Sequence, residues 1–242
     1  MKPAELSFAE AAAAPTVLCT AHTGLAIGKQ CSRILVHGAS GGVGACVIQL
    51  ARRRGCEVVG TCSAGNAQYV QGLGARALDY TTDWAAVLSR EEERFDLVLD
   101  CVGGDDLWHS SCPLLASGGR FVTAVGPIRH GGSEPVTYST MLWTAQLLCR
   151  RLLMNAVRAV EYRIFLGFER TALSRDPSLV KLLAEGGIRV RCDPKVFGLE
   201  ELAEAHARCQ GGSNTTGKLC VSVSRVDFLR ADSFATALGK TA

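Results

Sequence analysis

A glycine-rich turn between an apolar run and a helical pattern constrains the fold of this chain more than any other feature. The turn contains Gly41, Gly42 and Gly44; residues 34–37 precede it as a β-type run, and a helical apolar pattern follows from Ala45. Glycine has no Cβ, so the turn can be tight, its backbone can approach a ligand, and the helix can pack near the strand. A plain turn between buried elements needs only one such glycine. The strand, turn and helix together predict a loop that binds the pyrophosphate of a dinucleotide at a helix N-terminus.

The end of the second strand bears on which dinucleotide is bound. Residues 56–61 form the next β-type run, which leads into Cys62 and Ser63 without an acidic residue. An Asp or Glu there would bind the ribose 2′-hydroxyl and repel a 2′-phosphate, so its absence favours NADP(H) over NAD(H). Ser63 can donate a hydrogen bond to a phosphate oxygen or cap the helix that begins near Asn66, and one hydroxyl can do both.

Composition fits one α/β domain, with room for a small appendage. The 242 residues are enough to bury a full core, and 48% apolar with 6% aromatic residues is typical of aliphatic parallel strands covered by helices. The formal net charge of +3 is too small to indicate a nucleic-acid partner. The densest basic cluster, residues 52–54, precedes Gly55 at a predicted helix end, where cations complement the helix dipole; this interpretation is favoured over a phosphate-binding patch.

Cysteine usage and apolar runs bear on the compartment and on membranes. The eleven cysteines are scattered singly without a C-x-x-C pair, which favours reduced thiols over a disulfide framework or a zinc cluster. The longest apolar region, residues 141–160, is interrupted by Arg150 and Arg151, so the sequence predicts no transmembrane segment. Glu5 and Glu10 lie early and no arginine accompanies them, so the start of the chain is not typical of a transit peptide.

β-type and helical segments alternate along the chain. Up to residue 125 we expect strands over 56–61, 77–80, 95–100 and 119–125, and helices over 67–73, 83–92 and 105–115. This alternation predicts a doubly wound parallel sheet that binds ligands at the carboxyl ends of its strands. Beyond Pro127 we expect a loop over 129–135, helices over 139–160, 176–186 and 199–209, strands over 162–168, 188–192 and 217–223, and a tail from residue 224.

Several short motifs occur in a recognisable order. They are residues 6–12, 18–21, 38–44 with 49–51, 73–75, 100–104 and 217–218, together with 37–40 and 61–63. In this order the chain resembles the zinc-independent medium-chain dehydrogenases/reductases, in the quinone oxidoreductase branch, and within it the mitochondrial reticulon-interacting NADPH oxidoreductases. Members of that family carry an N-terminal GroES-like domain that supplies most of the substrate cleft. The resemblance implies that this chain is the cofactor-binding half.

The same resemblance implies a division of the chain into four parts. Residues 1–30 would be a lead-in from the missing substrate domain, and residues 31–160 the core of an NAD(P)-binding Rossmann domain. Residues 161–223 would hold the rest of the cofactor domain and remnant C-terminal strands of the absent GroES-like domain, and residues 224–242 a tail.

Cofactor contacts follow by resemblance. Ser40, Gly41, Gly42 and Val43 would contact the pyrophosphate, Ser63 and Tyr80 the 2′-phosphate, Cys101 and Val102 the ribose and adenine side, and Gly126 the region of the nicotinamide. Phe165 and Gly167, and the loop of Asn214, Thr215 and Thr216, match segments that close over the cofactor.

Some of these positions carry alternatives or departures from the family pattern. Tyr80 is also interpreted as a packed aromatic residue. Thr20 matches a threonine near the nicotinamide ring, with capping or core packing as its alternative. Ala64 stands where some relatives have a lysine, and Thr216 where relatives can have a basic residue, so weaker NADPH affinity is expected.

A zinc site is not expected. Zinc-dependent relatives place a ligand cysteine four residues before the threonine that matches Thr20, and this chain has Thr16 there, with Cys19 out of step. The structural zinc lobe belongs to the absent domain, and a catalytic zinc site needs three protein ligands.

The implied activity is hydride transfer from NADPH to a quinone or to an activated C=C or carbonyl group of a small-molecule acceptor. With its substrate domain missing, the chain alone would have low or no activity, and no catalytic residue is assigned. The alternative is a non-catalytic nucleotide-binding module for protein interaction. Relatives suggest a mitochondrial location, otherwise a cytoplasmic one, and a homodimer through the C-terminal edge of the nucleotide domain, where residues 162–168 would leave an open strand edge.

Overall fold

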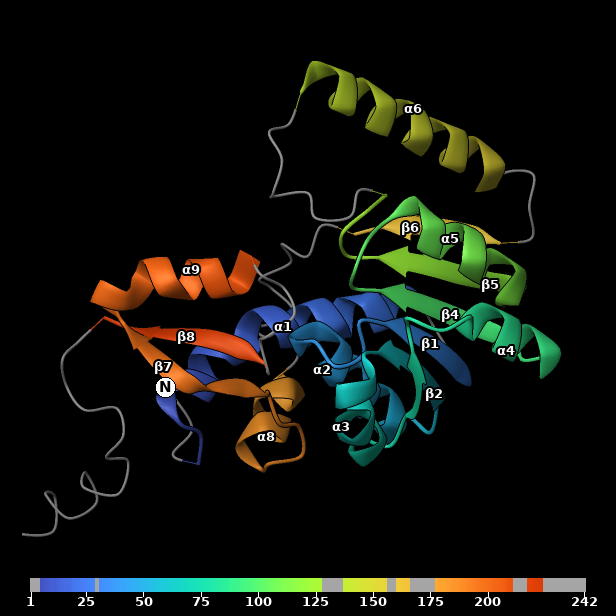
Figure 1. Ribbon diagram of the computed structural model, residues 1–242. Coiled ribbons are helices and arrows are strands. Elements are labelled where there is room, and N and C mark those ends of the chain that lie inside the picture. The colour runs from blue at the N-terminus through green and yellow to red at the C-terminus, as the bar shows by residue number, and fades with distance from the viewer. Residues whose placement is uncertain are drawn as a thin grey trace, which may run out of the picture. The chain divides into compact units, whose positions relative to one another are not determined.

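The computed structural model describes residues 5–28, 31–127, 137–155, 160–165, 177–210 and 217–223. The chain divides into two compact units: Thr16–Pro177, and Met1–Pro15 together with Ser178–Ala242. The larger unit holds a six-stranded parallel sheet in the order β3-β2-β1-β4-β5-β6 (Figure 1). The strands are β1 (Arg33–His37), β2 (Glu57–Cys62), β3 (Arg76–Asp79), β4 (Phe95–Asp100), β5 (Leu115–Thr123) and β6 (Glu161–Ile164). The predicted doubly wound α/β fold is confirmed.

Helices connect successive strands, as parallel pairing requires, and one further helix precedes the first strand. They are α1 (Phe8–Gly28), α2 (Gly42–Arg53), α3 (Ala67–Gly72), α4 (Trp84–Arg90), α5 (Asp105–Ser111) and α6 (Tyr138–Asn155), with 3₁₀ turns η1 (Ala64–Asn66) and η2 (Cys112–Leu114). The smaller unit contains α8 (Pro177–Ala184, whose first residue belongs to the larger unit), a parallel pair β7 (Cys192–Gly198) and β8 (Lys218–Ser222), η3 (Leu199–Glu201) and α9 (Leu202–Gln210). The four-part division of the chain stays a prediction.

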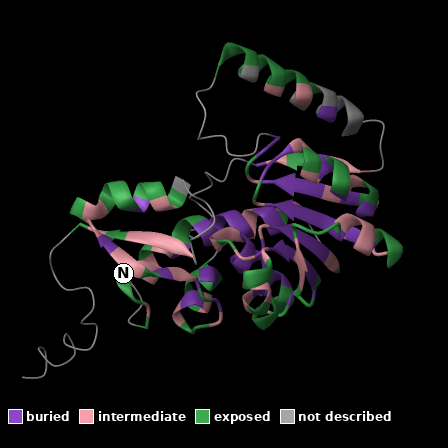
Figure 2. Cartoon of the chain, viewed as in Figure 1, coloured by how far each residue is buried: buried purple, intermediate pink, exposed green. Residues whose placement is uncertain are grey.

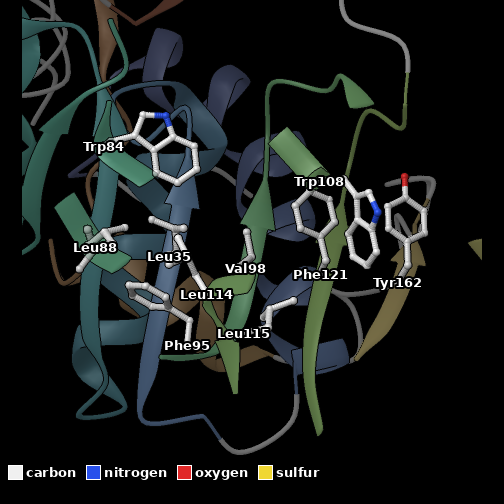
Figure 3. Close-up of a cluster of buried hydrophobic side chains, with 11 residues drawn as sticks. Leu35, Trp84, Leu88, Phe95, Val98, Trp108, Leu114, Leu115, Phe121 and Tyr162 are labelled. Atoms are coloured by element: carbon white, nitrogen blue, oxygen red, sulfur yellow. The ribbon is translucent and has the colours of Figure 1, made fainter. Parts of the chain in front are cut away.

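Aliphatic and aromatic side chains on one side of the sheet form a continuous core. Its members are Leu35, Val59, Trp84, Leu88, Phe95, Val98, Trp108, Leu114, Leu115, Phe121 and Tyr162 (Figure 3). At one end, the rings of Trp108, Phe121 and Tyr162 lie with their centroids 5.0 to 5.6 Å apart, in edge and stacked arrangements. Such aromatic pairs stabilise a core beyond the area they bury.

A buried arginine joins α6 to this aromatic cluster. The guanidinium of Arg151 lies 4.4 Å from the ring centroid of Tyr162 and 5.2 Å from that of Trp108, and it pairs with Asp105. Burial lowers the pKa of Arg151, while Tyr162 acts in the opposite direction. Most other positions along α6 whose side chains are described are exposed (Figure 2), among them Tyr138, Met141 and Trp143.

The carboxyl ends of the central strands meet in one row of buried polar residues. His37 lies opposite Thr61 on β2 and Asp100 on β4, and Asp100 lies opposite Thr123 on β5. We call Thr61, His37, Asp100 and Thr123 the last rung of the sheet. The ring nitrogens of His37 lie 3.0 Å from Thr61 Oγ1 and 2.8 Å from Ser111 Oγ, so this histidine has a structural role.

Helix α1 is an element that the sequence analysis treated only as a lead-in. Gly24 and Gly28 face β4 so closely that a Cβ would lie 2.7 Å from Leu99 Cδ1 and 2.5 Å from Leu97 Cδ2. By length and mean hydropathy α1 could cross a membrane. However, 56% of its most apolar stretch is buried inside the protein. Core helices meet the same criterion, so this is weak evidence for a span.

Three predicted elements need correction. Residues 188–191 do not form a strand; Ile188 and Val190 are buried, no strand of the described part of the chain includes them, and β7 begins only at Cys192. The helix predicted over 105–115 ends at Ser111, because Pro113 favours the 3₁₀ turn η2. As a result β5 begins at Leu115, four residues earlier than predicted. The predicted loop 129–135, the end of the strand 162–168 and the tail from 224 lie outside the described residues.

Gly44→Ala is expected to lower the free energy of unfolding by about 1–3 kcal/mol, as overpacking does. A Cβ at Gly44 would lie 2.3 Å from Gly38 O, and a backbone atom cannot move aside as a side chain can. Urea unfolding of the variant measures the change. Gly72→Ala, near the end of α3 in open space, is the control and should raise the stability by about 0.5–1 kcal/mol. Equal stability of both variants would contradict the close packing of α2 on the loop.

Glu161→Gln is expected to cost about 1 kcal/mol or less near neutral pH. The Arg120 hydrogen bond of 2.7 Å, and secondarily Arg163, hold the pKa of Glu161 below its usual value. A carboxyl whose pKa is lowered in the folded state stabilises the fold fully at pH values above its pKa in the unfolded chain, about 4.3. That stabilisation is lost as the pH falls through the folded-state pKa. The stability difference between wild type and variant should therefore shrink in urea titrations at decreasing pH.

The matched control is the cross-strand pair of Arg33 and Glu57. This pair joins directly opposite residues of β1 and β2, but the Glu57 side chain is 69% exposed, against 29% for Glu161. Glu57→Gln should change the stability by less than Glu161→Gln, because solvent screens exposed pairs. A larger effect at Glu57 would contradict the importance of the Arg120 contact.

Candidate functional site

The glycine loop lies between β1 and α2, at the carboxyl edge of the sheet. Gly38 turns the chain with a φ of 74°, and the Gly41 amide donates to Gly38 O over 3.0 Å. Gly41 occupies the N-cap of α2 and has no side chain with which to cap it. No side chain of the N-cap residue therefore caps the amides of Gly42 and Val43, which lie in the first turn of α2. An anion site at a helix N-terminus uses such amides.

Two glycines allow the loop, the helix and β2 to lie unusually close. A Cβ on Gly44 would meet Gly38 O and the Ala39 backbone, and a Cβ on Gly60 would lie 2.5 Å from Ala39 Cβ. A Cβ on Gly41 would lie 3.2 Å from Gly38 O. These approaches match the roles of glycines in a dinucleotide loop, namely a tight turn and close packing of helix and strand. The loop therefore fits a pyrophosphate.

The end of β2 brings Ser63 and Asn66 together. Asn66 Nδ2 donates to Ser63 Oγ over 3.0 Å, and the Asn66 amide donates to Ser63 O over 2.9 Å. The Ser63 side chain makes no capping hydrogen bond, so the capping alternative is not what the structure has. Asn66 is a polar residue of this edge to which the sequence analysis gave no role, although its spacing of three from Ser63 was a signal.

Tyr80 and Asp79 follow from β3 at the same edge. The Tyr80 amide donates to Cys62 O, and the Tyr80 side chain is 59% exposed, which disfavours its interpretation as a packed aromatic residue. Asp79 lies opposite Cys62 in the sheet register, and its Oδ1 accepts the Thr81 amide over 2.9 Å. Burial, and then the Asp79 charge, raise the pKa of the Cys62 thiol.

A buried carboxylate organises the loops after β4 and β5. Asp100 Oδ1 accepts the amides of Val102 and Gly103 over 2.8 and 2.9 Å, and Oδ2 accepts the Thr123 hydroxyl over 2.8 Å. Thr123 Oγ1 in turn accepts the Gly126 amide over 2.8 Å. The two loops also join directly, since the Gly104 amide donates to Gly126 O over 3.1 Å. The motif that contains Asp100 is visible in the sequence, whereas Thr123 carries no local signal, because only the sheet register brings it beside Asp100.

The residues assigned to the nucleoside side lie next to this carboxylate. Burial, together with the nearby Asp100 and Cys46, raises the pKa of the Cys101 thiol, so it stays protonated and is a poor nucleophile. Val102 and Val125 expose apolar surface at the strand ends. Gly126 has a φ of 98°, which favours glycine at this turn.

The remaining predicted positions divide into core residues and residues outside the described part. Phe165 follows β6, donates its amide to Thr123 O, and is buried with its ring toward Gly24 of α1. Thr20 is buried in α1 and donates its hydroxyl to Thr16 O over 2.7 Å, in keeping with the core alternative. Gly167, Asn214, Thr215 and Thr216 lie outside the described residues. Within the described ranges, His, Cys, Asp and Glu form no group of three or more that could hold a metal ion.

The sheet thus brings most described positions to one edge. The register places the ends of β2, β1, β4 and β5 side by side at the last rung. The loop of Ser40 to Val43 follows β1, Ser63 follows β2, Tyr80 follows β3, Cys101 and Val102 follow β4, and Gly126 follows β5. In open parallel sheets, ligands bind at this edge.

Comparison with known proteins agrees with this geometry. Residues 73–221 match the family described as zinc-binding dehydrogenase. The mitochondrial reticulon-4-interacting protein 1 of Caenorhabditis elegans is 42% identical over 86% of this chain and 58% of its own length. The mitochondrial NAD(P)H oxidoreductase RTN4IP1 of Danio rerio is 30% identical over 92% of this chain and 59% of its own length.

A solved structure shares the fold. The quinone oxidoreductase from Coxiella burnetii is 28% identical, with a TM-score of 0.67 over 90% of this chain and 62% of its own. The chain therefore spans about three fifths of the length of the relatives it matches. The resemblance predicted from the ordered motifs is confirmed: the chain belongs to the zinc-binding dehydrogenase family, among the medium-chain dehydrogenases/reductases that include the quinone oxidoreductases.

Proposed function

We propose that this chain is the cofactor-binding part of an NADPH-dependent oxidoreductase that transfers hydride to a quinone or to an activated C=C or carbonyl group. The observation that carries the proposal is the glycine loop, in which Gly44 lies against the Gly38 carbonyl and α2 begins at the carboxyl edge of the sheet. The names of the relatives, an NAD(P)H oxidoreductase and a quinone oxidoreductase, support the same class of reaction.

Each part of the site has a task in this proposal. Ser40, Gly41, Gly42 and Val43 bind the pyrophosphate through amides and the positive end of the α2 dipole. Ser63 and Tyr80 bind the 2′-phosphate, Cys101 and Val102 border the adenosine, and Gly126 lets the nicotinamide approach the backbone. By resemblance to the family, Phe165 and Gly167, and the loop of Asn214, Thr215 and Thr216, are the segments that would close over the cofactor.

The chain's own contribution to the reaction is binding, orientation and exclusion of water. The bound cofactor supplies the hydride. The hydrogen bonds of Asp100 and Thr123 hold the loops after β4 and β5 in one arrangement before the cofactor binds. Val102 and Val125 offer apolar surface that keeps water from this edge. The acceptor cleft belongs to the substrate domain of a longer relative, so we expect low or no turnover by this chain alone.

Preference for NADPH over NADH depends on the charges near Ser63. In favour of NADPH, β2 ends in Cys62 and Ser63 without a carboxylate. Against it, Asp79 lies opposite Cys62, although its carboxylate is engaged by the Thr81 amide. The hydroxyls of Ser63 and Tyr80 are the donors that favour a phosphate, so we expect a preference for NADPH that is modest.

A mitochondrial location and a homodimer are further parts of the proposal. Two relatives are named as mitochondrial, which supports the location. β6 pairs with β5 on one side and is the last of the described strands in the order of the sheet, so among these strands its other edge is left for a second copy. Pairing of β6 with its counterpart would form the dimer through the C-terminal edge of the nucleotide domain.

The second candidate is a non-catalytic module that binds nucleotide and a protein partner. It is favoured by the exposed apolar side chains of α6, namely Tyr138, Met141, Leu142 and Trp143. Both candidates bind nucleotide, but only the first acts on a quinone when a substrate domain is supplied. Oxidation of NADPH in the presence of a soluble quinone by a longer form of the protein would favour the first.

The first prediction from this proposal concerns nucleotide binding by the chain itself. Calorimetric titration should detect NADPH binding that is tighter than NADH binding. Gly42→Asp should abolish both, because a carboxylate at the start of α2 repels the pyrophosphate and fills the space it needs. Gly72→Asp, in open space at the end of α3, is the control and should bind as wild type does. Undiminished binding by Gly42→Asp would overturn the loop assignment.

The second prediction concerns Thr123. Thr123→Val keeps the shape but removes the hydroxyl between Asp100 and Gly126, so unfolding should become easier by about 1–3 kcal/mol. NADPH affinity should fall by roughly tenfold, since loops that must be ordered on binding lower affinity. Urea unfolding and calorimetry measure the two effects.

Ser111→Ala separates loop ordering from general destabilisation. It removes another buried hydroxyl, which lies 2.8 Å from the His37 ring and outside the loops after β4 and β5. It should lower stability by a similar amount and leave NADPH affinity unchanged. Equal loss of affinity in both variants would show that Thr123 acts through overall stability only.

A further inference from the structure

Asn66 lies at the start of a helix, but its side chain does not cap that helix. It is the N-cap residue of α3, a place where asparagine commonly accepts a backbone amide of the first turn. Here the Asn66 side chain makes no capping hydrogen bond, and its Nδ2 donates to Ser63 Oγ over 3.0 Å. The Asn66 side chain thus contacts the serine at the end of β2 and not a backbone amide in the first turn of α3.

Ser63 and Asn66 are held together by two hydrogen bonds. The backbone amide of Asn66 donates to Ser63 O over 2.9 Å, in addition to the contact between the side chains. The two intervening residues, Ala64 and Gly65, are exposed, and Ser63 itself is half-buried. The Ser63 hydroxyl is therefore held by Asn66 at the carboxyl edge of the sheet, in a residue that is partly exposed.

The direction of the hydrogen bond determines what Ser63 can do. A serine hydroxyl has one hydrogen to donate and two lone pairs that accept. Since Asn66 fills a lone pair, the hydroxyl hydrogen is left to point at an acceptor, and accepting a hydrogen bond strengthens a group as a donor. A phosphate oxygen is such an acceptor, whereas the 2′-hydroxyl of an unphosphorylated ribose can be satisfied by water.

We propose that Asn66 is a positioning residue that sets the preference for the 2′-phosphate by holding the Ser63 hydroxyl as a hydrogen-bond donor. This inference rests on the proposed function, because it assumes that Ser63 faces the ribose 2′-position of the cofactor. It assigns a role in selectivity to a side chain that does not touch the phosphate itself. Its effect on binding passes entirely through Ser63.

A double-mutant cycle on the complete 242-residue chain tests the dependence on Ser63. Ser63→Ala should lower NADPH affinity about tenfold, the usual loss for a hydrogen bond to a charged group, with little change for NADH. Asn66→Ala should lower NADPH affinity by about three- to tenfold. The double variant should be no weaker than Ser63→Ala alone. Calorimetric titration with both nucleotides gives the ratio of affinities, which general loosening of the structure would leave unchanged.

Asn66→Asp tests the direction of the hydrogen bond. An aspartate oxygen in place of Nδ2 takes the Ser63 hydrogen for itself, so the serine would offer only lone pairs to the phosphate. NADPH affinity should fall by more than in Asn66→Ala, and NADH affinity should fall much less. Gln68→Glu is the charge control, because it adds the same charge at an exposed position of α3 without replacing a partner of Ser63.

Each outcome decides. Additive losses in the cycle, an unchanged NADPH to NADH ratio in Asn66→Ala, or equal effects of Asn66→Asp and Gln68→Glu would overturn the role of Asn66 while leaving the proposed function intact. If the wild-type chain bound neither nucleotide, both the proposed function and this inference would fall. Thermal unfolding of each variant identifies loss of folding, and if Asn66→Ala does not fold, the uncharged Asn66→Leu replaces it in the cycle.

Discussion

The Asp100 carboxylate is the contact on which the carboxyl edge of the sheet depends. A buried charge destabilises a protein unless it is hydrogen-bonded, and Asp100 is fully buried with donors on both of its oxygens. Those donors come from the loop that follows its own strand and from the neighbouring strand β5. Because these hydrogen bonds offset the burial of the carboxylate, movement of the chain after β4 would break two of them and destabilise the fold. The shape of the candidate site thus depends on Asp100, the last residue of β4.

The central part of the fold could be predicted because its signals are local. The apolar run of β4 and the glycines after β1 each declare themselves within a few residues, and β4 matches its predicted bounds of residues 95–100. Helix α1 could not be found in the same way: its apolar residues lie on all sides, and Pro15 stands inside it. The buried run at Ile188 and Val190 looks like a strand by composition, but no strand among the described residues includes it. Burial and pairing are separate conditions, and only burial is visible in composition.

The candidate site divides in the same way. The loop of Ser40 to Val43 is a contiguous motif, so the sequence indicated it and its geometry fits. Thr123 and Asn66 can be recognised only from their contacts in the structure. Thr123 donates to Asp100 of another strand, and the Asn66 side chain donates to Ser63 and does not cap α3. Phe165 and Thr20, which match cofactor contacts of the family, are buried, so the match alone does not say how their side chains would contact a cofactor. Local motifs therefore predict where a ligand lies better than which side chains hold it.

The parallel pairing of β1 also has a consequence during synthesis of the chain. Its partner β4 is distant in the sequence: Asp96, whose carboxylate accepts a hydrogen bond from the Arg33 amide, lies 63 positions after Arg33. As the chain leaves the ribosome, β1 and β2 can associate while one edge of β1 still lacks a neighbour, and such edges favour aggregation. Closing long loops also slows folding. Nascent chains that stop short of Asp100 should therefore be the forms that depend most on chaperones.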